Sequence, residues 1–105
     1  MSTPLYFLCR LLPPRSDFMA TMTAAERTVM QAHVAYWTGK VGSGQAVAFG
    51  PVADPAGGYG IGIIRVGDRR EVEALRDADP AMQSGLGFSY DILPMPQLVT
   101  APPTG

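Results

Sequence analysis

Apolar residues near the start of the chain follow one another without the alternating polar positions of a surface element. The run covers residues 5–12, Leu-Tyr-Phe-Leu-Cys-Arg-Leu-Leu, and is closed by Pro13-Pro14. Proline has no N–H to give to a sheet ladder, so this pattern predicts a buried strand that ends at Leu12. Residues 15–22 then predict an irregular connection.

A different period begins after this connection. Val29, Met30, His33 and Trp37 follow one another at spacings of one, three and four, which gathers them on one helix face. Thr23-Ala24-Ala25-Glu26 has the form of a capping box, in which the hydroxyl and the carboxylate satisfy backbone N–H groups. The pattern predicts a helix from about Thr23 to Lys40, stopped by the glycines that follow.

The rest of the chain predicts a hairpin, a second helix and a last strand. The hairpin pairs residues 45–52, interrupted by Gly50-Pro51, with residues 59–66. Asp68 caps the helix, which carries Val72 and Leu75 inward and stops at Asp79-Pro80, because proline disfavours the α conformation in the residue before it. Residues 86–93 form the last strand, and a proline-rich tail follows.

This order of elements predicts an α+β fold of the ferredoxin-like βαββαβ type. Its four strands form an antiparallel sheet with both helices on one face. We expect one domain over residues 1–96 and a tail over residues 97–105. The other sheet face is left bare, and pairing it with a second copy would cover it. The composition agrees, since 47% of residues are hydrophobic and only 16% charged. A homodimer is therefore expected.

Charge and composition exclude several classes of partner. The net charge is -1 and the basic residues are dispersed along the chain, so the sequence predicts no basic surface that would bind the phosphates of a nucleic acid. No apolar run approaches the roughly 18 residues that cross a bilayer, and the first residues lack the basic region of a signal peptide. We expect a cytoplasmic protein. One cysteine and one histidine leave no set of ligands for a metal.

Residues 58–62, Gly-Tyr-Gly-Ile-Gly, resemble a dinucleotide-binding glycine motif only superficially. Such a motif must follow a strand and open a helix within a parallel βαβ unit, and here it lies within a strand. No cofactor is expected. As a strand, the segment places its glycines on one face, which suits close packing or the floor of a pocket beneath His33.

His33 is the residue with the clearest chemical potential. A histidine on an apolar stripe is usually a core residue bonded to a backbone carbonyl, and periodicity alone favours that interpretation. With a carboxylate to fix its tautomer, the same imidazole could take or give a proton near neutral pH. Asp79 lies just beyond the second helix, on the same side of the sheet, although Asp-Pro is also a common turn starter.

The ordered set of His33, Gly50-Pro51 and Asp79-Pro80, with the aromatic first strand, resembles the YCII-like (YciI-related) family over almost the whole chain. The resemblance implies a dimeric α+β barrel and a His–Asp pair, His33 and Asp79, as the active site. The longer segment after Pro14 and the proline-rich tail depart from the family pattern.

Four further residues are candidates for substrate binding. Arg15, at the exit of the first strand, could bind an anionic group, although a solvated loop arginine is equally compatible with its position. Tyr36 could border the pocket. Gly50 and Pro51 belong to the pattern on which the resemblance depends.

Two hypotheses of function follow. The first is a cofactor-independent enzyme in which His33 and Asp79 move a proton on a small organic substrate, in an isomerase or a lyase reaction such as dehydrohalogenation. The alternative is a non-catalytic dimeric module that binds a small ligand or regulates through the same pocket. Contact between His33 and Asp79 beside an accessible cavity would favour the first.

Overall fold

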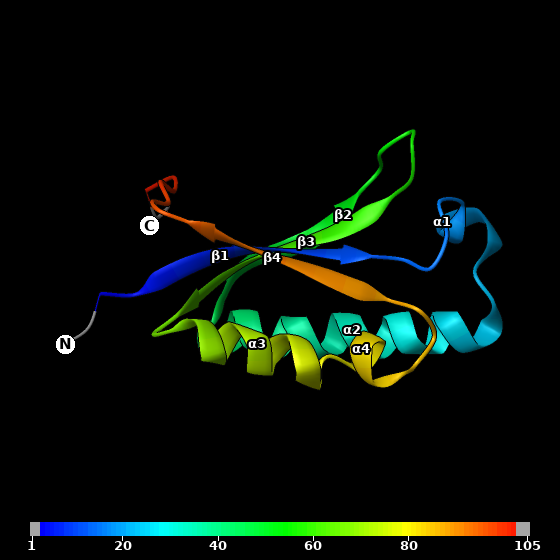
Figure 1. Ribbon diagram of the computed structural model, residues 1–105, viewed down its shortest axis with the longest axis horizontal. Coiled ribbons are helices and arrows are strands. Elements are labelled where there is room, and N and C mark those ends of the chain that lie inside the picture. Colours follow the sequence, from blue (N-terminus) through cyan, green and yellow to red (C-terminus); the bar gives the residue numbers. More distant parts are fainter. Residues whose placement is uncertain (1–2, 103–105) are drawn as a thin grey trace.

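The computed structural model describes residues 3–102 and has the predicted α+β architecture (Figure 1). Four strands form one antiparallel sheet in the order β2-β3-β1-β4. They are β1 (Leu5–Leu12), β2 (Ala46–Val52), β3 (Tyr59–Val66) and β4 (Ser89–Met95). The helices are α1 (Phe18–Thr21), α2 (Ala24–Ser43), α3 (Arg69–Ala78) and α4 (Pro80–Gln83). This is the strand order of the ferredoxin-like fold. Residues 1–2 and 103–105, the ends of the predicted domain and tail, lie outside the described residues.

Alternation along β1 places the core between the sheet and the helices. Phe7, Cys9 and Leu11 are buried on the face of the sheet that carries the helices. Phe7 and Cys9 share a core cluster with Ile64 and Trp37, and Leu11 lies in a second cluster. Side chains of a strand alternate between its faces, so the intervening residues of β1 lie on the opposite face of the sheet. In Figure 1 the helices α2, α3 and α4 lie below the sheet, α1 lies beyond its end, and no described helix covers its upper face.

The long helix α2 begins where the capping box predicts. The Thr23 hydroxyl accepts from the amide of Glu26 at 3.1 Å, and the Glu26 carboxylate accepts from the amide of Thr23 at 2.8 Å. The helix runs three residues beyond the predicted end and stops at Gly44, whose φ of 84° favours glycine. Its length carries His33 over the centre of the sheet.

Three local predictions were wrong or incomplete. The connection after Pro14 contains the short helix α1, and a second short helix, α4, follows Asp79. The last strand was predicted at residues 86–93 but covers 89–95, because Gly85 and Gly87 adopt positive φ and delay its start. Pro51 and Pro94 interrupt neither β2 nor β4. Both are edge strands, in which the N–H groups on the outer side have no neighbouring strand to bond to. Proline, which lacks an N–H group, is therefore tolerated there.

Candidate active site

Asp79 is a fully buried carboxylate surrounded by hydrogen-bond donors. Its side chain is 0% exposed. Oδ2 accepts from Nδ1 of His33 at 2.8 Å, from Nε1 of Trp37 at 2.8 Å and from the hydroxyl of Tyr90 at 2.5 Å. Oδ1 accepts from the amide of Ala81 at 2.8 Å. Residues from α2, β4 and the α3–α4 junction therefore converge on one acceptor.

The local sequence explains how this carboxylate reaches the core. Asp79 ends α3 and has the extended backbone, with φ of -62° and ψ of 129°, that a following proline favours. Pro80 occupies the first turn of α4, where its missing N–H costs nothing, and Asp79 caps that helix through the Ala81 amide. The side chain that caps α4 is thus held in one orientation, in contact with α2.

Asp79 remains ionised despite its burial. Burial acts to raise the pKa of the carboxyl group, but the hydrogen bonds from His33, Tyr90, Trp37 and the Ala81 amide together hold it below the ordinary value of 3.8. The pKa of Tyr90 is raised by its burial and by its bond to this carboxylate. At neutral pH, Tyr90 is therefore a neutral donor and Asp79 a negatively charged acceptor.

An ionised Asp79 fixes the tautomer of His33. A carboxylate only accepts hydrogen bonds, so Nδ1 carries the proton that it donates to Asp79. No described residue forms a hydrogen bond with the other ring nitrogen, Nε2, and the side chain of His33 is 13% exposed. In the neutral imidazole, Nε2 therefore holds a free electron pair.

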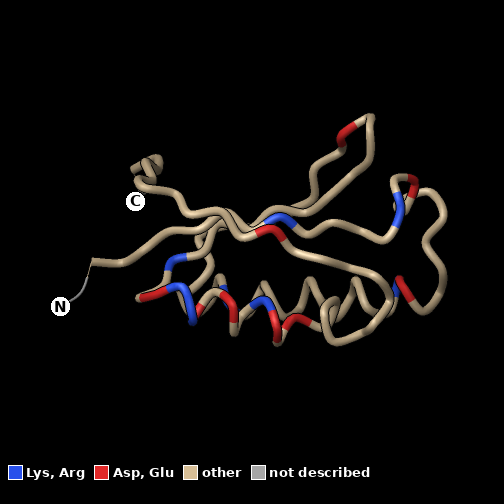
Figure 2. Tube along the Cα trace, viewed as in Figure 1, with Lys and Arg blue, Asp and Glu red and all other residues tan. Residues whose placement is uncertain are grey.

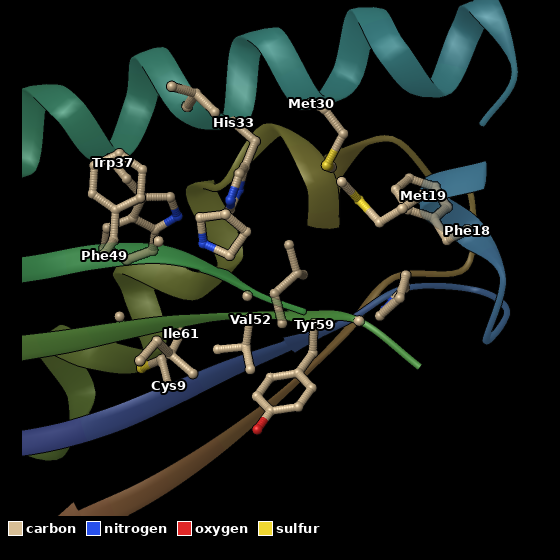
Figure 3. A pocket seen from close by; sticks show the side chains of 18 of the residues that line it. Cys9, Phe18, Met19, Met30, His33, Trp37, Phe49, Val52, Tyr59 and Ile61 are labelled. Atoms are coloured by element: carbon tan, nitrogen blue, oxygen red, sulfur yellow. The ribbon is translucent and has the colours of Figure 1, made fainter. Parts of the chain in front are cut away.

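His33 lines a cavity of about 420 Å³ between α2 and the sheet. Figure 3 shows its imidazole directed from α2 toward the strands, with Trp37 and Phe49 to one side and Met30, Met19 and Phe18 to the other. Gly50 and Pro51, predicted to bind substrate, also line this cavity. The volume lies within the range of small-molecule sites, roughly 300–1,000 Å³.

Arg15 and Tyr36 were predicted to bind substrate, but neither lines this cavity. The Arg15 guanidinium donates to both carboxylate oxygens of Glu26, at 2.7 and 2.8 Å, and to Thr21. Tyr36 donates its hydroxyl proton to the carbonyl of Leu75 at 2.7 Å and so joins α2 to α3. Both side chains are used within the fold, Arg15 to hold the α1 segment against the start of α2.

Sequence reasoning missed Tyr90 and gave Trp37 only a place on the apolar helix face. Trp37 does pack in the core, but its indole nitrogen also bonds to Asp79. The three partners Trp37, Asp79 and Tyr90 are brought together only by the fold, so no spacing along the chain marks them. The sole local signal was the spacing of four between His33 and Trp37, which puts both on one helix face.

Other reactive groups do not add to the site. Burial raises the pKa of Cys9 to about 11, so its side chain is a thiol at neutral pH. Among residues 3–102, no three histidine, cysteine or acidic side chains are close enough together to bind a metal ion. No helix in the same range has both the length and the apolar character that a membrane span requires.

Comparison with known families identifies the domain to which the chain is similar. Residues 7–96 match the sequence profile of the YCII-related domain. A search of curated proteins finds no match. The matched range begins within β1 and contains the other three strands and every residue of the His33–Asp79 arrangement.

Proposed function

Since this chain belongs to the YCII-related domain family, we propose that it is a cofactor-independent enzyme that moves a proton on a small organic substrate. His33 is the general base, and Asp79 orients it. The observation that carries the proposal is the bond from Nδ1 of His33 to a fully buried carboxylate, beside a cavity that His33 lines. This arrangement leaves Nε2 available to a bound molecule.

A single general base, Nε2 of His33, limits the reaction to classes that begin with proton abstraction. Nε2 takes a proton from a carbon next to an electron-withdrawing group, and the imidazolium that forms is stabilised by Asp79. Return of the proton to another atom of the substrate gives isomerisation. Departure of a leaving group instead gives elimination. Both reactions begin with the same proton abstraction.

Proton abstraction can be tested before the natural substrate is known. We expect the protein to accelerate exchange of α-hydrogens for deuterium in at least one member of a panel of small cyclic and aryl ketones, followed by NMR in D₂O. Free imidazole at the same concentration is the control. Exchange no faster than with imidazole across the panel would favour the alternative, a module that binds its ligand without turnover.

We also propose that the chain forms a homodimer through the sheet face opposite the helices. The register places apolar side chains there, among them Leu8 and Ile63 on the central strands and Leu93, which is 48% exposed. A small domain rarely leaves such a face uncovered.

Light scattering is expected to give twice the chain mass for the wild type. The variant Leu93→Glu should give the mass of one chain, because a carboxylate would be buried without a partner. Val99→Glu, which changes an exposed apolar residue of the tail, is the matched control and should remain dimeric. A wild-type monomer at micromolar concentration would contradict the proposed dimer.

A further inference from the structure

The walls of the cavity beside His33 are apolar almost throughout. None of the described residues that line it is a lysine, arginine, aspartate or glutamate. The hydrogen-bonding side chains among the lining residues are those of Cys9, His33, Trp37, Tyr59 and Tyr90. Trp37 and Tyr90 already donate to Asp79, and Figure 3 shows the Tyr59 side chain directed away from His33. A molecule in the cavity therefore meets one free polar atom of functional interest, Nε2 of His33.

The charges nearest to the cavity disfavour an anion. The buried carboxylate of Asp79 stands directly behind His33, and it would already neutralise a protonated imidazole. Arg15 cannot serve as a counter-ion, because Glu26 holds its guanidinium at 2.7 and 2.8 Å. Many of the other charged residues lie along α3 (Figure 2). An anion would lose its hydration without gaining a cation.

The floor of the cavity is bare backbone. Gly60 and Gly62 pair with Leu11 and Cys9, whose side chains point toward the helices. Side chains at the two glycine positions would point the same way, so their absence exposes the backbone on this face. Both glycines line the cavity, and Figure 3 shows the His33 side chain directed from α2 toward the strands. Two glycines at alternate positions leave a shallow flat surface, which suits the face of a ring better than a branched chain.

The far end of the cavity is formed by Phe18, Met19, Met22 and Met30. Thioether side chains are flexible and polarizable, and they contact aromatic rings favourably. Phe18 is itself held by an edge-on contact with Phe88, with ring centroids 5.3 Å apart. This end wall therefore provides an adaptable apolar surface for the part of a molecule that lies away from His33.

We infer that the substrate is a neutral molecule with a flat ring, which lies on Gly60 and Gly62 with its acidic proton toward His33 and an apolar substituent toward the methionines. Anions of the same size are rejected. This inference deepens the proposed function and rests on it for the orientation toward His33. The preference for neutral rings depends on the walls alone.

Calorimetric titration with two probes of matched shape tests the preference. At pH 7, 4-ethylphenol is neutral and 4-ethylbenzoate is negatively charged, since phenols have a pKa of about 10 and carboxyl groups a pKa of about 4. We expect 4-ethylphenol to bind at least tenfold more tightly than 4-ethylbenzoate. Equal affinity, tighter binding of the benzoate, or no binding of either probe would overturn the inference.

The glycine floor is tested by Gly62→Ala. The added methyl would lie 3.6 Å from Cδ1 of Ile64 and 3.8 Å from Cβ of Phe49, which are ordinary contacts, so the fold should be kept. We expect affinity for 4-ethylphenol to fall at least fivefold, with an unchanged or higher melting temperature. Gly39→Ala, at an open position on α2 outside the cavity, should leave the affinity unchanged. Unchanged affinity in Gly62→Ala would refute a ring on this floor.

Failure of this inference and failure of the proposed function give different results. Selective binding of 4-ethylphenol without deuterium exchange in any ketone supports the neutral cavity and refutes proton transfer. Exchange confined to ketones that carry a carboxylate supports proton transfer and refutes the neutral cavity. In the variant His33→Gln, the neutral probe should still bind more tightly than the anionic one, because the apolar walls are intact.

Discussion

Replacement of Asp79 by alanine is expected to lower the free energy of unfolding by about 3–5 kcal/mol, because several buried donors lose one charged acceptor at once. The change removes the only acceptor shared by His33, Trp37, Tyr90 and the Ala81 amide. Each buried donor left without a partner costs about 1–3 kcal/mol. Trp37 keeps a second acceptor, the Tyr90 hydroxyl at 3.2 Å. Urea denaturation followed by circular dichroism measures the loss.

Asp77→Ala is the matched control for this prediction. It removes the same side chain two positions earlier, but the Asp77 carboxylate is largely exposed and pairs only with its neighbour Arg76. Its effect should stay within about 0.5 kcal/mol. A similar small loss for Asp79→Ala would mean that water replaces the carboxylate, and that the donors do not depend on it.

Asp79→Asn separates the charge of this residue from its shape. One arm of the amide becomes a donor and faces other donors, so an intermediate loss of stability is expected. The folded-state pKa of Asp79 is below 3.8, so its ionisation stabilises the fold above pH 3.8 and this contribution is lost as the pH falls through the lower, folded value. The asparagine variant should therefore lose less stability on acidification. Glu26, whose pKa the Arg15 bond lowers to about 2, titrates in both proteins.

The elements of this fold were predictable where a local pattern determines them. The limits of β1, the capping box of α2 and the break at Asp79-Pro80 each depend on residues within a few positions of one another. The start of β4 was misplaced because the conformations of Gly85 and Gly87 depend on how the chain packs, and on no apolar period.

The residues of the candidate site also include some that the sequence predicts and some that it does not. A helical stripe pointed to His33, and family resemblance pointed to Asp79, whereas Tyr90 enters through a contact between β4 and the α3–α4 junction that no spacing encodes. Arg15 shows the converse. Its place after Pro14 suggested an anion site, but a carboxylate of the chain itself, Glu26, is the anion that it binds. Sequence alone does not reveal which of two partners a guanidinium will meet.

Replacement of His33 by glutamine is expected to lower the rate of deuterium exchange by about 10²–10⁴-fold, the usual contribution of a positioned general base. The glutamine amide can still donate a hydrogen bond to Asp79, so the loss of folding stability should be about 1 kcal/mol. The rate is measured on whichever ketone the wild type exchanges fastest, at saturating concentration, so that the change reports chemistry rather than affinity.

Two further variants distinguish the loss of the base from a general disturbance of α2. Gln31→Ala changes an exposed residue two positions earlier and should exchange at the wild-type rate. His33→Ala leaves a space for imidazole beside the cavity, and added imidazole should restore part of the lost rate, because the free base can occupy the site while Asp79 still orients it. A structural role for His33 predicts no such rescue. If His33→Gln exchanges within threefold of the wild type, the proton is moved by another group and Asp79 serves the fold alone.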